Sequence, residues 1–110
     1  IVAWLRREAL TKFRVRAHEY SGRLNLPPPN VALSNAKGRW GSCSSKSGIR
    51  LSWRLALLPE VLANYVIAHE IAHLVHMNHS PRFWAVVEQL HPDCKASRRE
   101  LRQHERTLSV

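Results

Sequence analysis

Three consecutive prolines, Pro27 to Pro29, divide the sequence into a part with helical periodicity and a part with strand periodicity. Proline lacks a backbone N–H and restricts the residue before it, so a helix does not continue through such a run. Before the prolines, from Ile1 to about Leu24, apolar residues recur every three or four positions with basic residues between them. This spacing predicts an amphipathic helix that ends at the prolines.

After the prolines, apolar and polar residues alternate, as in strands that are buried on one face. One alternating run covers residues 31–34, and another covers residues 49–55. The segment Arg39–Cys43 and the polar residues 44–48 precede the second run, which predicts a β-hairpin with a polar loop. We expect Trp40 and Trp53 to be cross-strand residues of the core.

The second half of the chain predicts three further helices. Pro59 and Glu60 suit a first helical turn, and residues 61–76 are apolar on nearly every side, which predicts a buried central helix. Ser80 and Pro81 fit the N-cap and first position of a second helix. Asp93 is expected to cap a last helix of mostly charged residues, with Leu101 and Leu108 as its apolar anchors.

The composition limits the classes to which the chain belongs. Its 110 residues are 45% apolar, which is enough for one domain with a modest core. Its first residues lack the pattern of a secretion signal, and no apolar stretch reaches the roughly 18 residues that a membrane helix needs, so we expect a soluble, cytoplasmic protein without a membrane partner. In the cytoplasm, Cys43 and Cys94 are expected to be buried reduced thiols. Because the first residue is Ile1, we expect residues 1–110 to be a single domain from the C-terminal part of a longer protein.

The predicted central helix contains the segment His69-Glu70-Ile71-Ala72-His73. Two histidines at positions i and i+4 project from one face of a helix, where they can bind one metal ion, and Glu70 is angled toward the open side of the metal. This pattern is typical of a hydrolytic zinc site, in which zinc lowers the pKa of a water to about 7 and the glutamate accepts its proton. Two hydrogen-bonded core histidines are the alternative, but they would leave Glu70 buried without a partner, at a free-energy cost of several kcal/mol.

A third zinc ligand is expected close to this segment. His79 lies six positions beyond His73, so a turn at Asn78 in the left-handed region would bring it back to the metal. Glu88, on the following helix, is the alternative third ligand. His76 lies on the same helix face but too far along the axis, and is expected to be a residue that supports the ligands or lines the cleft.

The spacing from His69 to His79 is that of the metzincins, but His76 replaces their glycine and the only methionine is Met77, so their downstream Met-turn is absent. A closer match is the segment HEIAHLVHMNHSPRFW, taken with WGSC at residues 40–43 and WRLALLP at residues 53–59. Together they closely resemble the YgjP-like metallopeptidase domain family, whose relatives are the SprT and Wss1-like zincins. The resemblance implies a zincin fold, His69, His73 and His79 as zinc ligands, and Glu70 as the catalytic acid and base. It also implies a further N-terminal region, and the relatives' action on proteins crosslinked to DNA is a more distant analogy.

We therefore expect an α+β, zincin-like domain, in which a small sheet packs on an active-site helix that carries H-E-x-x-H between flanking helices. The expected function is that of a zinc-dependent metallopeptidase with one zinc ion per chain and Glu70 as general base. A zinc hydrolase of a non-peptide bond is one alternative. A nucleic-acid-associated module with structural zinc is another, although such sites usually have four ligands, often cysteines.

The expected partner is a peptide or protein substrate, and no feature of the sequence specifies an oligomeric state. The strand with Gly41 and Ser42 is expected to form the rim of the cleft, where a substrate peptide pairs with the edge of the sheet. Cys43 is expected to be a small packed residue and not a nucleophile. Residues 30–58 contain five basic residues and no acid, which indicates either a solvated face or a nucleic-acid surface.

Overall fold

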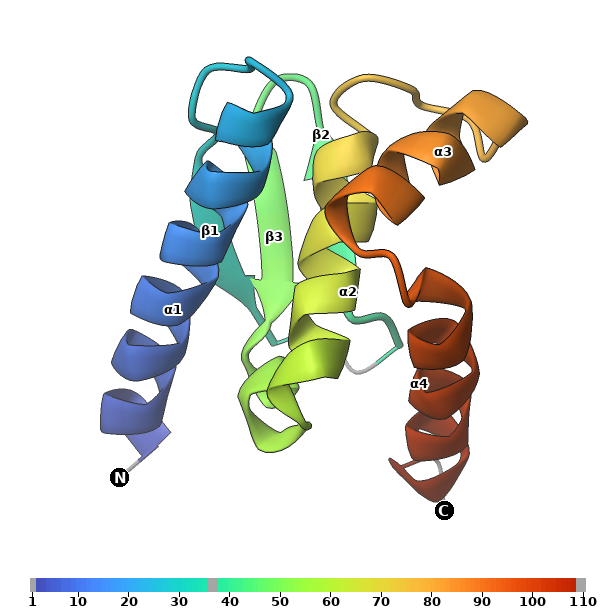
Figure 1. The fold of residues 1–110 in the computed structure, drawn as a ribbon. Helices are drawn as coiled ribbons and strands as arrows, with labels where there is room; N and C mark the ends of the chain where they lie inside the picture. Colours follow the sequence, from blue (N-terminus) through green and yellow to red (C-terminus); the bar gives the residue numbers. More distant parts are fainter. Residues whose placement is uncertain (1, 36–37, 109–110) are drawn as a thin grey trace.

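The computed structural model describes residues 2–35 and 38–108, and within them it has an α+β fold, as the sequence predicts (Figure 1). The elements in chain order are α1 (Val2–Arg23), β1 (Val31–Ser34), β2 (Gly41–Ser44), β3 (Gly48–Ser52), the 3-10 helix η1 (Trp53–Leu57), α2 (Glu60–Ala72), α3 (Pro81–Leu90) and α4 (Cys94–Leu108). Among these helices, none combines the length and the apolar character that crossing a bilayer requires.

The three strands form a mixed sheet in the order β1-β3-β2. β2 pairs with β3 in antiparallel orientation, so the predicted hairpin is confirmed, and β1 pairs with β3 in parallel. Gly48, which begins β3, has φ 85°, and a Cβ there would lie 2.5 Å from the backbone oxygen of Asn30. Only glycine combines this φ with that close approach at no steric cost. The strand order places β2 at one edge of the sheet.

The second alternating run ends earlier than its pattern predicts. β3 stops at Ser52, whose hydroxyl accepts a hydrogen bond from the Arg54 N–H at 3.3 Å and so caps η1. Trp53 is therefore a half-buried residue of η1, with the Arg54 guanidinium carbon 5.1 Å from its ring centroid. Trp40 is also half-buried, and its indole donates to a Glu105 carboxylate oxygen at 2.9 Å. The prediction that both tryptophans are cross-strand core residues is therefore wrong for Trp53, whereas Trp40 packs against the core and its carbonyl accepts from the Ser52 N–H of β3 at 2.8 Å.

The helices α1 and α2 lie side by side on one face of the sheet, and α3 and α4 pack against α2 on the side away from α1 (Figure 1). The helix predicted before the prolines is confirmed, and its periodic residues Phe13 and Ala17 are buried. Ile49 and Leu51 of β3 complete the core beneath the helices, whereas Arg50, which points the other way, is exposed. α2 is thus buried along most of its length.

The central helix is shorter than the sequence predicts, because it ends at Ala72 and not near His76. The N–H groups of Leu74 and Val75 bond to carbonyls three residues earlier, at 3.0 Å each, which tightens the chain into turns directly after the helix. A left-handed turn at Asn78 was also predicted, but among the described non-glycine residues a positive φ occurs at Asn25 alone, so that prediction is wrong. The chain reverses through residues 73–75.

The last two helices begin where the sequence predicts. The hydroxyl of Ser80 accepts a hydrogen bond from the Phe83 N–H at 3.3 Å, which confirms Ser80 as the N-cap of α3 with Pro81 at its first position. α4 begins directly after Asp93, and its anchor Leu101 is buried. The second predicted anchor is Leu108, whose side chain lies outside the described residues.

Candidate metal centre

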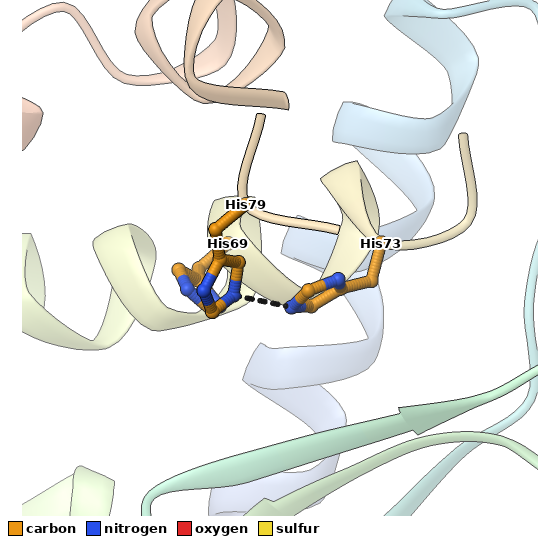
Figure 2. Close-up of side chains that lie close together, drawn as sticks. All are labelled: His69, His73 and His79. Carbon is orange, nitrogen blue, oxygen red and sulfur yellow. Dashed lines mark hydrogen bonds between the residues drawn. The ribbon is translucent and has the colours of Figure 1, made fainter. Parts of the chain in front are cut away.

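Three histidines converge where α2 gives way to the loop before α3 (Figure 2). His69 is in the last turn of α2, His73 is its C-cap, and His79 lies in the loop. Each histidine offers one ring nitrogen, and the three nitrogens all lie within 4.8 Å of one another. Nε2 of His79 is 3.1 Å from Nε2 of His73. The turns at residues 73–75 and the bend at residues 77–78 bring His79 back to the helix, without a left-handed residue at Asn78.

The local sequence explains how His79 is held there. The Ser80 N–H bonds to the Asn78 carbonyl at 2.8 Å, which closes a three-residue turn with His79 at its centre. Ser80 is then fixed as the N-cap of α3, so His79 has well-defined structure on both sides. The ring of Phe83, which is fully buried, packs against the cluster, with its centroid 5.0 Å from the ring of His69, 4.6 Å from that of His73 and 4.8 Å from that of His79.

Hydrogen bonds determine which ring nitrogens are free for a metal. His73 donates its Nδ1–H to the backbone carbonyl of His76 at 3.3 Å, so its lone pair is at Nε2, which faces His79. His69 donates its Nδ1–H to Oε2 of Glu70, also at 3.3 Å. Burial and the neighbouring His69 and His73 lower the pKa of His79, which favours the neutral form that binds metals. The carbonyl group of His76 supports the cluster, because its hydrogen bond fixes the tautomer of His73.

The cluster fits a metal ion that prefers imidazole ligands. A zinc ion has Zn–N distances of about 2.0–2.1 Å, so two tetrahedral ligands lie about 3.3 Å apart, close to the 3.1 Å between His73 and His79. The predicted alternative ligand Glu88 is exposed on α3 and does not belong to the group. Three histidines without a fourth protein ligand, among the residues that the structure describes, leave a coordination position for water or substrate.

Glu70 lies beside the cluster and is 6% exposed. Its carboxylate is packed against β2, because a Cβ on Gly41 would lie 3.1 Å from Cγ and 3.3 Å from Oε2 of Glu70. Both residues line a cleft of about 210 Å³, which also reaches His69. The arrangement therefore places a carboxylate between a potential metal site and a space that can accept a ligand.

The cleft has walls from β2, α2 and α4. Its lining residues are Trp40, Gly41, Tyr65, Val66, His69, Glu70, Arg98, Leu101, Arg102 and Glu105. The contribution of α4 was missed by sequence reasoning, which read that helix as mostly charged. The available signal was the spacing of residues 98, 101, 102 and 105, which places them on one helical face.

The two predicted substrate-binding residues differ in position. Gly41 lines the cleft next to Glu70, but Ser42 is not among the lining residues and lies opposite Arg50 in the neighbouring strand. The next residue, Cys43, is a free thiol that is partly buried. Burial, together with the charge of Glu70, raises its pKa to about 11, so the thiolate is scarce at neutral pH. The other cysteine, Cys94, is free and buried, as predicted.

The basic middle of the sequence lies mostly on the surface. The described residues Arg39, Lys46 and Arg50 are exposed, whereas Lys37 lies outside the described residues. Arg54 is half-buried and donates to the backbone carbonyl of Asn35 at 3.2 Å. Arg50 is on the face of the sheet opposite to α1 and α2, so this basic surface is separate from the histidine cluster.

The chain matches a known protein family over most of its length. The model of a family described as "YgjP-like, metallopeptidase domain" matches residues 1–104, which is nearly the whole chain. The matched region contains α1, the sheet, the three histidines and the cleft wall on α4 through Arg102. No curated protein and no solved structure shows significant similarity to the chain.

Proposed function

The chain belongs to the family of YgjP-like metallopeptidase domains, and from this premise we propose that it hydrolyses peptide bonds at the histidine cluster. His69, His73 and His79 hold a zinc ion, one per chain, and Glu70 is the general base. The observation that carries the proposal is the convergence of three ring nitrogens within 4.8 Å beside a buried carboxylate that lines a cleft. The proposed fold is zincin-like, with α2 and the residue after it supplying the H-E-x-x-H segment.

When bound, zinc would supply Lewis-acid chemistry, lowering the pKa of a water and polarising the carbonyl of the substrate. The chain keeps its ligands in position before the metal binds. The His76 carbonyl fixes the tautomer of His73, and Phe83 limits the rotation of all three rings. Such a preformed donor set reduces the ordering that metal binding must impose on the side chains.

Glu70 is placed to move a proton and not to bind the metal. It follows His69 directly, so it is rotated by about 100° around the helix axis from that ligand. Its carboxylate faces the cleft, where it can accept a proton from water and later donate it to the leaving amine. Burial against Gly41 restricts the carboxylate to a small region, which favours proton transfer in one geometry.

The edge of the sheet next to Glu70 suits an extended peptide. β2 pairs with β3 on one side, and as the terminal strand of the sheet it has an outer edge on the other. A substrate strand that pairs with this edge would pass Gly41, whose missing side chain leaves room beside the carboxylate. In this proposal the backbone of residues 41–42 binds the substrate, although the Ser42 side chain does not reach the cleft.

The donor set favours catalysis over a structural role for the metal. A structural zinc site usually has four protein ligands and is often rich in cysteine. The described part of the chain provides three histidines at this site, and Cys43 and Cys94 do not belong to the group. A hydrolase of a non-peptide bond would use the same residues, and the family membership favours the peptide bond.

The substitution Glu70→Gln tests the proposed function. Glutamine keeps the size of the side chain but does not accept a proton near neutral pH, so we expect wild-type zinc content with hydrolysis slowed about 100-fold. The rate is measured on an unstructured protein and on a mixed peptide library, with zinc content determined in the same samples. Glu88→Gln, on the exposed part of α3, is the matched control and should keep the wild-type rate. Wild-type hydrolysis by Glu70→Gln would show that Glu70 is not the base.

A further inference from the structure

The wall of the cleft on α4 carries two arginines one helical turn apart. Arg98, Leu101, Arg102 and Glu105 are spaced i, i+3, i+4 and i+7 and all line the cleft. Leu101 is buried in the core and so anchors this face of the helix, whereas both arginines are exposed. The guanidinium groups therefore lie at the solvent-exposed opening of the cleft, on a helix that is held in place by its packing against α2.

Arg98 lies next to the histidine cluster. Its guanidinium carbon is 4.8 Å from the ring centroid of Trp84. That ring is in turn 5.8 Å from the rings of both His69 and His79. Stacking on Trp84 orients the planar guanidinium group.

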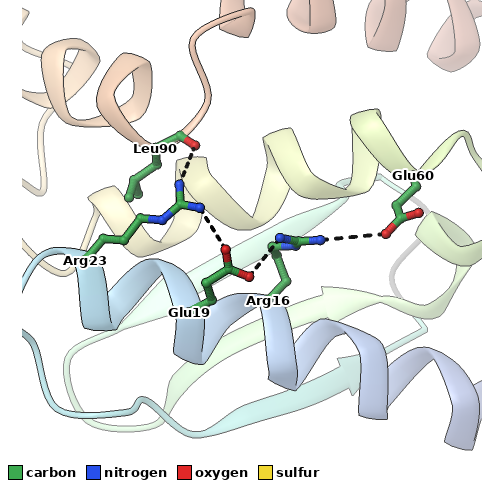
Figure 3. Close-up of polar contacts among 5 residues, drawn as sticks. All are labelled: Arg16, Glu19, Arg23, Glu60 and Leu90. Carbon is green, nitrogen blue, oxygen red and sulfur yellow. Dashed lines mark hydrogen bonds and ion pairs between the residues drawn. The ribbon is translucent and has the colours of Figure 1, made fainter.

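Neither arginine has a carboxylate partner among the residues that the structure describes. The two acids of the cleft have other contacts, because Glu70 accepts from His69 and Glu105 accepts from the indole of Trp40. Arginines on α1 differ: Arg16 and Arg23 both pair with Glu19, at 2.8 and 2.7 Å (Figure 3). The cleft thus contains two guanidinium groups that are available to a ligand.

We propose that Arg98 and Arg102 form a subsite for a carboxylate of the substrate, close to the peptide bond that is cut. The inference rests on the proposed function and adds a substrate class to it, namely peptides with an acidic group beside that bond. A guanidinium group binds a carboxylate through two parallel hydrogen bonds, and a second arginine one turn away adds charge on the same side. The carboxylate could belong to an aspartate or glutamate side chain or to the C-terminus of a peptide.

The test measures binding separately from catalysis. Fluorescently labelled peptides carry glutamate or glutamine at each central position in turn, and each is made with a free or an amidated C-terminus. Dissociation constants are determined by fluorescence anisotropy with zinc-loaded Glu70→Gln protein, and kcat/KM with the wild-type enzyme. Both quantities are then measured for the same peptides after the double substitution Arg98→Gln/Arg102→Gln, which is made in the Glu70→Gln protein for binding and in the wild-type enzyme for kcat/KM. Arg99→Gln is the matched control, because Arg99 is an exposed residue of the same helix outside the cleft.

We expect a carboxylate at the right position to strengthen binding about three- to tenfold, a modest factor because both arginines are exposed. The double substitution should abolish this preference, and Arg99→Gln should keep it. A preference between glutamate and glutamine assigns the subsite to a side chain, and a preference between acid and amide assigns it to the C-terminus.

Two results would overturn the subsite. One is equal binding of all the peptides to the protein with both arginines intact, and the other is a preference that survives their substitution. A loss of kcat that is equal for every peptide, with unchanged dissociation constants, would also overturn it, because it would place the arginines at the reacting atoms. If the wild-type enzyme cleaves none of the peptides, the proposed function fails, and the binding data still decide on the subsite.

Discussion

Replacing Gly41 with alanine tests whether the close approach of β2 sets the position of Glu70. The added Cβ would lie 3.1 Å from Cγ and 3.3 Å from Oε2 of Glu70, and 3.2 Å from Cδ2 of Leu51. Carbon atoms in favourable contact are about 3.5–4.0 Å apart, so these neighbours must move by a few tenths of an ångström. Leu51 is fully buried in the core, whereas Glu70 borders the cleft, so the carboxylate is the group that moves.

The expected effect is small for stability and larger for catalysis. Gly41 does not have a positive φ, so alanine fits its backbone and gains about 0.4–1 kcal/mol by restricting the unfolded chain. Overpacking costs about 1–3 kcal/mol, which leaves a net loss of about 1 kcal/mol in the free energy of unfolding. A misplacement of about 1 Å in an active site can lower a rate about 100-fold, so the smaller shift here should lower kcat about tenfold.

The assay combines kcat, zinc content and the midpoint of urea unfolding for Gly41→Ala and for a matched control. Gly38→Ala serves as the control, because a Cβ there has no atom within 4 Å. We expect both variants to retain zinc and the control to retain the wild-type kcat. If Gly41→Ala hydrolyses substrate at the wild-type rate, the contact between Gly41 and Glu70 does not determine the position of the base.

Two further predictions concern Cys43 and the basic surface. With a thiol pKa of about 11, about one Cys43 side chain in a thousand is a thiolate at pH 8. Iodoacetamide should therefore modify Cys43 far more slowly in the folded protein than in urea, as followed by mass spectrometry. The variant Cys43→Ala should keep the wild-type hydrolysis rate, and a large loss would indicate a catalytic thiol. If the surface with Arg39 and Arg50 binds nucleic acid, the affinity should fall steeply with salt and Arg39→Gln/Arg50→Gln should reduce the salt slope by about two. Absence of binding at about 50 mM salt would leave that surface as a solvated face.

The features that could be predicted from the sequence depend on residues near one another in the chain. The i, i+4 spacing of His69 and His73, the capping pair Ser80-Pro81 and the polar loop of the hairpin each describe local backbone geometry. The proximity of His79 to His73 was also predicted, but through a different turn. Apolar residues continue past Ala72, so the periodicity alone does not show where α2 ends.

The features that could not be predicted depend on contacts between distant residues. The hydrogen bond between Trp40 and Glu105 joins positions 65 residues apart, and no local pattern indicates it. The contact of Gly41 with Glu70 likewise depends on how β2 packs against α2. The sequence around Arg98 and Arg102 indicates only a charged helix, because the packing of α4 beside β2 and α2, which makes the cleft, depends on the tertiary fold.

The zinc content of purified protein tests most directly the claim that His69, His73 and His79 form a metal centre. Mass spectrometry of the metal in wild-type protein and in the alanine variants of these histidines, with His76→Ala and Glu88→Ala as controls, compares ligands with neighbours in one experiment. We expect one zinc ion per wild-type chain, a loss of affinity by orders of magnitude for the three ligand variants, and little change for the two controls. Metal retained by His79→Ala but lost from Glu88→Ala would contradict the three-histidine centre.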